Sequence, residues 1–226
     1  MATIRNIAVH HSGGLGNNNY ASSFNLTWEQ VNAAHKARWN FPSEYIENSY
    51  GGYNFIYDPK TGFFHQYRAI GEETAAQIGY NFDTVSICII GNYSINPKTG
   101  TPVDPLTTRT SENIAKLILN LISGEHAYLI KPGTKIDLST SRAFPHRHYQ
   151  PTTECYGTGL TNSWIQDVLA KYSKVDVDGQ LKKRMFLERE IQRLLLQIAR
   201  LREKLKVKER LGGASPYDRE CEGFIH

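Results

Sequence analysis

Cysteine is scarce in this chain. Of the 226 residues only Cys88, Cys155 and Cys221 are cysteines, an odd number spread far apart along the sequence. This is not the pattern of a disulfide framework, so we expect a protein made in a reducing compartment. No apolar run approaches the length of a membrane-spanning helix. The first residues lack the apolar segment and the small-residue cleavage site of a signal peptide, and we therefore expect synthesis in the cytoplasm.

Two common catalytic motifs are missing as well. The glycine-rich stretch 13–19 contains neither GxGxxG nor GK[ST], which argues against a site for nucleotide phosphates. No HExxH motif is present to supply two histidines and a carboxylate base from one helix. A metal site that draws two ligands and its base from one helix is therefore not expected.

Positive charge is concentrated near the end of the chain. The formal net charge is +4, but residues 182–210 alone hold eleven Lys/Arg and four Asp/Glu, a net charge of +7. The rest of the chain holds 15 Lys/Arg and 18 Asp/Glu, a net charge of −3. The basic segment holds one aromatic residue, Phe186, and no series of base-stacking aromatics among its charges, so we do not expect nucleic acid as a partner. Its charge suits contact with anionic polymer or lipid surfaces, an attraction that salt would weaken.

Strand and helix patterns alternate before residue 174. Apolar or aromatic runs predict strands at 3–10, 53–57, 63–67, 84–90 and near 127–130, the second and third joined as a hairpin. Helical periodicity predicts helices at about 27–39, 114–122 and 164–169. Thr27 is expected to cap the first helix in a capping box with Gln30, and Gly124 to end the second. The predicted fold class is α/β, with a mixed central β-sheet flanked by helices.

Three segments are expected along the chain. Residues 1–174 form the α/β domain, residues 175–211 a long basic helix, and residues 212–226 a flexible tail. Apolar residues in the basic segment recur in alternating spacings of four and three, at Leu187, Ile191, Leu194, Ile198, Leu201 and Leu205. Isoleucine at two of the a positions, with leucine at d, favours a parallel two-stranded coiled coil. We therefore expect a homodimer formed through this helix.

A candidate metal site is divided between two distant stretches. Residues 145–157 carry His146, His148 and Cys155 within one loop rich in Pro, Thr and Gly. Imidazole nitrogen and cysteine thiolate are the ligands that zinc prefers, so two of these groups would make half of a tetrahedral site. The first strand ends in His10 and His11, at the carboxyl end of a strand, where open α/β sheets gather their sites. We predict that the two stretches meet around Zn²⁺, with His146 and His148 both candidates for the loop histidine.

Four stretches, taken in order, match a known family. They are 7–14, 52–55, 86–92, and His146-Arg147 followed by 153–155. In these residues the chain resembles the zinc-dependent N-acetylmuramoyl-L-alanine amidases, a family that includes amidase-type phage lysozymes and the peptidoglycan recognition proteins. The resemblance spans roughly residues 4–170 and does not extend to the basic segment.

The resemblance implies a set of site residues. His10, His146 and Cys155 would bind the zinc ion and leave its fourth position for water. Tyr53 would lie near the attacked carbonyl, and Thr153 would lie beside the oxyanion. Apart from the resemblance, we hypothesise that the zinc-bound water and Tyr53 share the acid/base role that the leaving amine requires.

The chain departs from the family pattern at a few positions. The interval from His146 to the ligand cysteine is one residue longer than is usual, which makes His148 a competing ligand. Arg147 follows His146 as in the family's His-Arg pair, and this favours His146. Asn54 and Ala76 stand where many members have histidine, so one substrate contact is expected to differ.

The activity that the resemblance implies is hydrolysis of peptidoglycan. A zinc-activated water would cleave the amide bond between N-acetylmuramic acid and L-alanine, as in a phage-type endolysin. Such an enzyme would be made in the cytoplasm and would reach the cell wall by a separate export or lysis route. A non-catalytic peptidoglycan-binding module and a structural lysin component of a larger particle are the alternatives. Non-catalytic relatives generally lose the thiolate ligand, so the presence of Cys155 favours the hydrolase.

Overall fold

The computed structural model describes residues 2–14, 18–124, 126–153, 155–173 and 191. The chain divides into two units, residues 1–175 and 176–226, and every described residue except Ile191 belongs to the first. The expected heptad helix at 175–211, apart from this one residue, and the expected tail at 212–226 lie outside the described residues. No helix among the described residues is long and apolar enough to cross a membrane.

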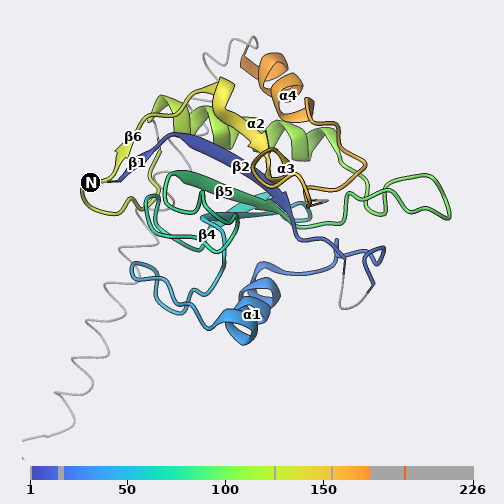
Figure 1. Ribbon diagram of the computed structural model, residues 1–226, viewed down its shortest axis with the longest axis horizontal. Coiled ribbons are helices and arrows are strands. Elements are labelled where there is room, and N and C mark those ends of the chain that lie inside the picture. The colour runs from blue at the N-terminus through green and yellow to red at the C-terminus, as the bar shows by residue number, and fades with distance from the viewer. Residues whose placement is uncertain (1, 15–17, 125, 154, 174–190, 192–226) are drawn as a thin grey trace, which may run out of the picture. The chain divides into compact units, whose positions relative to one another are not determined.

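A mixed five-stranded sheet forms the centre of the first unit (Figure 1). Its strands lie in the order β4 (Phe63–Gln66), β3 (Phe55–Asp58), β5 (Thr84–Ile89), β2 (Asn6–His11) and β7 (Ala143–Pro145). The β3–β4 hairpin is antiparallel, as expected from the aromatic runs, and the other neighbours are parallel. A second, two-stranded sheet pairs β1 (Thr3–Ile4) with β6 (Lys135–Ile136). The predicted α/β class with a mixed sheet is confirmed.

Helices cover both faces of the central sheet. Figure 1 shows α1 on one side of the sheet and α2 and α4 on the other. The helices are α1 (Trp28–Trp39), α2 (Thr108–Ser123), α3 (His146–Tyr149) and α4 (Trp164–Ser173), with a 3₁₀ turn η1 at Thr140–Arg142. Thr27 and Gln30 form the expected capping box of α1. Gly124 ends α2 in the left-handed conformation, with φ of 71°, as expected for a glycine at this position.

Strand alternation sends side chains to two separate cores. On the α2 and α4 side the sheet buries an extended apolar cluster that includes Ile7, Val9, Ile87 and Leu117. On the α1 side a smaller cluster contains Val31, Ile56, Tyr67, Cys88 and Ile90. The α1 side therefore buries fewer apolar side chains than the other face, and it is the face that carries the candidate site.

Two of the predicted strands differ in the structure. No strand forms at 127–130, because the backbone groups of Leu129 bond to the Gln66 side chain and to Ile70 rather than to a strand ladder. The predicted first strand is interrupted at Arg5, where the N–H groups of Arg5 and Asn6 both donate to the Asp83 carbonyl. This break divides it into β1 and β2, which belong to different sheets.

Candidate metal centre

The first candidate ligand, His10, lies near the carboxyl end of β2, which has a parallel partner on either side. Its register partner on β5 is Cys88, so the two side chains project from the same face of the sheet, towards α1. His11 projects from the opposite face, where its Nδ1 accepts a hydrogen bond from the Tyr93 N–H at 3.2 Å. Strand alternation therefore selects His10, the first histidine of the pair, for the site.

The second candidate ligand is brought beside the first by strand pairing. β7 runs parallel to β2 with Val9 opposite Pro145, and His146 follows directly as the first residue of α3. The rings of His10 and His146 lie 4.4 Å apart between centroids. His10 is 1% exposed and His146 is 8% exposed. The loop expected around His146 is thus a short helix at its start, and this turn directs the imidazole back over β2.

Cys155 completes the cluster through bonds that fold its loop onto α3 and β2. The Arg147 N–H donates to the Cys155 carbonyl at 3.1 Å, which closes the loop behind His146. The His11 N–H donates to Cys155 Sγ at 3.4 Å. The Cys155 N–H in turn donates to the hydroxyl oxygen of Thr153 at 3.2 Å. These bonds place the sulfur atom at the end of β2, beside His10.

The Arg147 side chain holds the segment that follows the cysteine. Its guanidinium donates to the carbonyls of Gly157, at 3.3 Å, and Leu160, and it lies over the ring of Tyr156 at 5.1 Å. A planar group with several donors can satisfy two carbonyls and an aromatic face at once, which a lysine cannot. The His-Arg pair noted in the sequence is therefore a candidate ligand followed by the residue that anchors the loop of Cys155.

The three groups have the spacing of a metal centre. One ligand atom from each of His10, His146 and Cys155 lies within 4.8 Å of the others. Cys155 Sγ is 3.7 Å from His10 Nδ1. Zinc bonds of about 2.1 Å to nitrogen and 2.3 Å to sulfur, at a tetrahedral angle, place such atoms about 3.6 Å apart. Both ring nitrogens of the buried His146 have no hydrogen-bond partner among the described residues, and a metal ion would satisfy one of them.

Burial sets the protonation of the three groups. It is the largest cause lowering the pKa of His10, to well below its usual 6.5, and it also lowers the pKa of His146. Both imidazoles are therefore neutral at pH 7 and offer a lone pair. Burial raises the pKa of the Cys155 thiol to about 12, so the sulfur keeps its proton unless a cation displaces it. Two neutral imidazoles and a thiol of this kind fit a divalent, thiophilic ion such as zinc.

Tyr53 lies beside this cluster, and Thr153 lies within the cysteine loop. The Tyr53 ring is 5.1 Å from the His10 ring, and burial raises the pKa of its phenol well above 10, so the hydroxyl is a donor and not a base at neutral pH. Thr153 accepts the Cys155 N–H and keeps its own hydroxyl proton free to donate. Thr153 therefore shapes the loop in addition to any contact with substrate.

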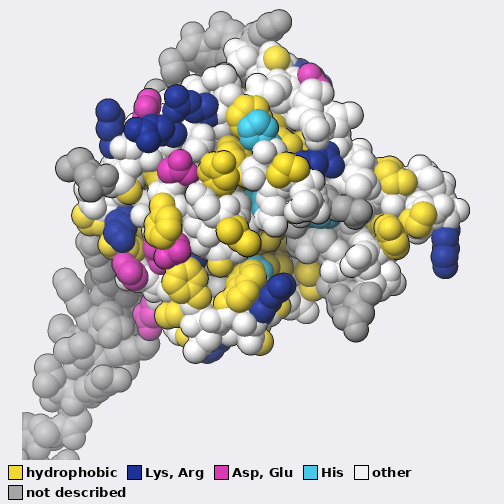
Figure 2. Space-filling model, viewed as in Figure 1, with side chains coloured by type: hydrophobic (Ala, Val, Ile, Leu, Met, Phe, Trp, Pro, Cys, Tyr) yellow, Lys and Arg dark blue, Asp and Glu magenta, His cyan; other side chains and the backbone are white. Residues whose placement is uncertain are grey.

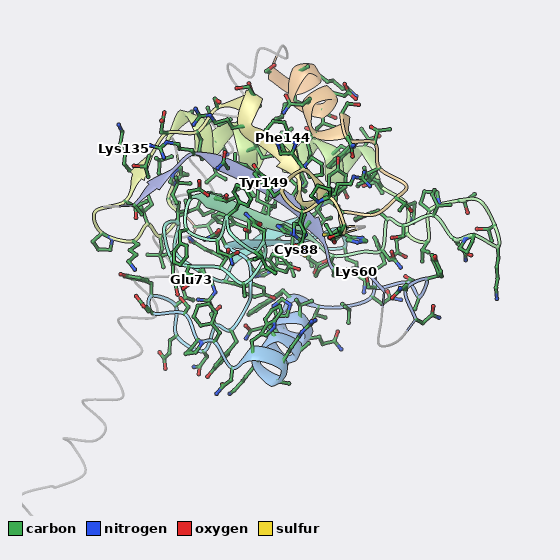
Figure 3. The ribbon with its side chains drawn as sticks, viewed as in Figure 1. Lys60, Glu73, Cys88, Lys135, Phe144 and Tyr149 are labelled. Carbon is green, nitrogen blue, oxygen red and sulfur yellow. The ribbon has the colours of Figure 1, made fainter. Side chains whose placement is uncertain are left out.

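His148 does not join the cluster. It is exposed, and its ring stacks on Phe144 with centroids 3.9 Å apart and an interplanar angle of 12°. Figure 3 labels Phe144 and Tyr149 near the β7–α3 junction, and their ring centroids lie 6.3 Å apart. His146 therefore keeps its place in the cluster, and His148 does not take it. The extra residue inferred from the sequence lies in the loop after His146.

Two buried amides near the site were not identified as site residues from the sequence. Gln77 Oε1 lies 2.9 Å from His10 Nε2, and the side chain is 2% exposed. Asn54 connects β3 to β5, because its amide oxygen accepts the Ser86 N–H at 2.9 Å and its amide nitrogen donates to the Ala69 carbonyl at 3.0 Å. A single glutamine in a loop has no distinguishing pattern, so only the structure shows the contact to His10.

Some histidine side chains reach the surface that faces the viewer in Figure 2. Figure 2 shows them near the middle of the view, among hydrophobic and uncharged groups, while a group of Lys and Arg side chains lies over the β6 end of the sheet. His10 and His146 themselves are 1% and 8% exposed, so the cluster has buried surroundings beneath this surface. Such surroundings exclude water and strengthen the electrostatic effect of any cation held there.

Comparison with known proteins supports the fold. No protein-family model matches the chain, and no curated protein matches it in sequence. The Ph2119 endolysin, from bacteriophage Ph2119 of Thermus scotoductus MAT2119, matches with a TM-score of 0.50 and 14% identity over 75% of this chain and 86% of its own. N-acetylmuramoyl-L-alanine amidase LysC from Clostridium intestinale URNW matches with a TM-score of 0.47 and 17% identity, over 76% and 98% of the two chains. Drosophila PGRP-LB matches with a TM-score of 0.43 and 18% identity, over 78% and 83%.

The first of these likenesses shows that the chain has the fold of the Ph2119 endolysin. The resemblance drawn from four short stretches of sequence is therefore confirmed at the level of the fold.

Proposed function

We propose that the chain is a zinc-dependent peptidoglycan hydrolase of the endolysin type, which cleaves the amide bond between N-acetylmuramic acid and L-alanine. The observation that carries this proposal is the cluster of His10, His146 and Cys155, whose ligand atoms lie within 4.8 Å of one another. The fold shared with a phage endolysin supports it. A partly buried thiol and two buried, neutral imidazoles that meet beside the end of β2 have no evident role in folding that apolar residues would not serve as well.

The chain's own residues hold and surround the metal. His10, His146 and Cys155 supply three ligands, which leaves a fourth position for solvent or substrate. Bound zinc would supply a Lewis acid that lowers the pKa of a coordinated water and polarises the substrate carbonyl. Arg147 holds the cysteine loop against α3, so that the sulfur stays near the end of β2.

Tyr53 and Thr153 are the proposed catalytic residues. The Tyr53 phenol stays protonated at neutral pH, so it would donate a hydrogen bond to the oxygen that becomes negative as the amide is attacked. The Thr153 hydroxyl would donate to the same oxygen while its own oxygen still accepts the Cys155 N–H. A preorganised donor of this kind contributes about 2–4 kcal/mol to the lowering of the barrier.

The test combines metal content with product chemistry. The purified full-length chain is expected to contain one zinc ion per chain by elemental mass spectrometry. Incubated with purified peptidoglycan, it should release new amino groups whose N-terminal residue is L-alanine, and a chelator should stop this release. A chain that sediments with peptidoglycan but releases no amino groups would be a binding module. That result would overturn the hydrolase while leaving the fold intact.

The basic segment at 182–210 carries separate proposals. We propose that its apolar repeat forms a parallel homodimer and that its +7 charge draws the enzyme to anionic wall polymers or lipid surfaces. The enzyme would act on the cell wall after a separate export or lysis route. Sedimentation of the full chain and of a truncation after Ser173 tests the dimer. The same number of protomers in both would contradict a dimer formed through the basic segment. Salt-dependent binding to purified wall by the full chain alone would support the charge contact.

A further inference from the structure

A buried glutamine supports the imidazole of His10 from behind. Gln77 lies in the segment between β4 and β5, is 2% exposed, and places Oε1 2.9 Å from His10 Nε2. We infer that Gln77 is a positioning residue for the metal centre: it fixes the ring orientation and the tautomer of His10, so that Nδ1 faces the ion. This rests on the proposed function only in requiring a metal ion at the cluster.

The two nitrogens of His10 face different partners. Nε2 faces the amide oxygen of Gln77, and Nδ1 faces Cys155 Sγ at 3.7 Å. An amide oxygen can only accept a hydrogen bond, so Nε2 must carry the proton. Nδ1 then has a free lone pair directed towards the sulfur and the position between the ligands. Metal-binding histidines commonly have such an acceptor on the second nitrogen, which fixes the tautomer and raises the basicity of the first.

Neighbouring bonds hold the amide oxygen in this orientation. The hydroxyl of Ser86, on β5, donates to the same Gln77 oxygen at 3.2 Å. The Gln77 N–H donates to Asn81 Oδ1 at 2.8 Å, and the Ala76 N–H donates to the same oxygen at 3.2 Å. Asn81 thus fixes the backbone of the loop while Ser86 fixes the end of the glutamine side chain. An inverted amide would instead donate from Nε2 to Ser86 Oγ, and it would require the His10 Nδ1 proton to face Cys155, which leaves no lone pair towards the cluster.

Folding stability does not explain a glutamine at this position. Its Nε2 group is buried and has no hydrogen-bond partner among the described residues. A buried amide donor without a partner is unfavourable, and an apolar side chain of similar length would avoid it. The side-chain hydrogen bonds that Gln77 does make are to Ser86 and His10, and of these only His10 belongs to the cluster. The unpaired donor is therefore the cost of presenting an acceptor to His10.

Zinc affinity measured by competition with a chelating indicator tests the inference. Gln77→Leu removes the acceptor at nearly constant volume and should weaken zinc binding by about 10–100-fold, the usual effect of losing such a support. Gln77→Glu keeps an acceptor oxygen and should bind zinc like the unmodified chain. Gln66→Leu is the matched control, since Gln66 bonds to Arg68 and Leu129 away from the cluster. Unchanged affinity in Gln77→Leu, or equal losses in Gln77→Glu or Gln66→Leu, would overturn the inference.

The tautomer of His10 provides a readout that needs no variant to fold. Nitrogen-15 NMR of the unmodified, metal-free chain, labelled at histidine, should show His10 with its proton on Nε2. A proton on Nδ1 would overturn the inference. If the unmodified chain binds no zinc, the proposed function fails, and this measurement still decides whether Gln77 sets the tautomer. If zinc binds equally well with and without the glutamine amide, the inference fails and the proposed function stands.

Discussion

The sulfur of Cys155 lies 3.7 Å from Nδ1 of His10, although 145 positions separate the two residues in the chain. Parallel pairing of β7 with β2 accounts for most of this convergence, because it brings the start of α3 beside the end of β2. The Arg147 N–H, bonded to the Cys155 carbonyl, then turns the cysteine back over the same strand end. The pair therefore depends on the sheet as much as on either loop.

Removal of any one ligand is expected to abolish stoichiometric zinc binding. His10→Ala, His146→Ala and Cys155→Ala each leave two ligands where three lie within 4.8 Å of one another. His148→Ala is the matched control. This histidine stacks on Phe144 outside the cluster, so the variant should keep its zinc. Elemental analysis after gel filtration measures the ratio. Zinc lost from the His148 variant and retained in the His146 variant would reverse the ligand assignment.

Tyr53→Phe should lower turnover without loss of metal. The phenol lies beside His10 and remains protonated at neutral pH, so its loss removes one donor to the developing oxyanion. The expected fall in kcat is about 10²–10³-fold. Tyr50→Phe, three positions earlier on the chain, is the control and should keep full activity. Amine release from purified peptidoglycan and zinc content are measured together, and wild-type turnover in Tyr53→Phe would exclude the proposed role.

Gly157→Ala should disturb the cysteine loop more than an ordinary glycine substitution does. Gly157 has φ of +99°, and an added Cβ would lie 2.4 Å from the carbonyl carbon of Tyr93. Gly133 has φ of +79° but nothing within 4 Å of an added Cβ, so Gly133→Ala reports the backbone cost alone. We expect losses in the free energy of unfolding of roughly 2–4 kcal/mol for Gly157→Ala and roughly 1–2 kcal/mol for Gly133→Ala.

Urea denaturation of both glycine variants measures these losses, and zinc affinity should fall in Gly157→Ala alone. Equal unfolding free energies in the two variants would show that the backbone around Gly157 and Tyr93 can shift to make room for the added Cβ.

His35 is expected to make the domain less stable in mild acid. It is partly buried between Trp39 and Tyr53, and its Nδ1 accepts the Gly52 N–H at 3.0 Å. Burial is the main cause that lowers its pKa from 6.5 to about 4. Between these values the unfolded chain binds the proton and the folded chain does not, so stability is full above pH 6.5 and falls as the pH drops towards 4.

The substitution His35→Asn keeps an acceptor for the Gly52 N–H and removes the titration. Between pH 7.5 and 4.5 the melting temperature should therefore fall less in this variant than in the unmodified chain. The fall should not vanish, because burial also lowers the pKa of His11 to about 4. His148→Asn should follow the unmodified chain, and an identical pH profile for His35→Asn would show that His35 does not contribute.

Local patterns were sufficient to predict most of the elements. The β-branched run at 84–90 forms a strand that is buried along its whole length, and the Thr27–Gln30 capping box begins α1 as expected. These features depend on neighbours a few residues away, whose chemistry is visible in one stretch of sequence. The expected strand at 127–130 fails because its backbone bonds to Gln66, some sixty positions earlier, and no local pattern reports such a bond.

The candidate site shows the same division. The sequence by itself determined which residue types could bind zinc, and through the order of four short stretches it indicated His10, His146 and Cys155. Tertiary structure alone decided that His146 and not His148 faces His10, because the direction of an imidazole depends on where α3 begins relative to β7. It alone placed Gln77 behind His10, because a hydrogen bond of 2.9 Å between residues 67 positions apart depends on strand register and not on sequence spacing.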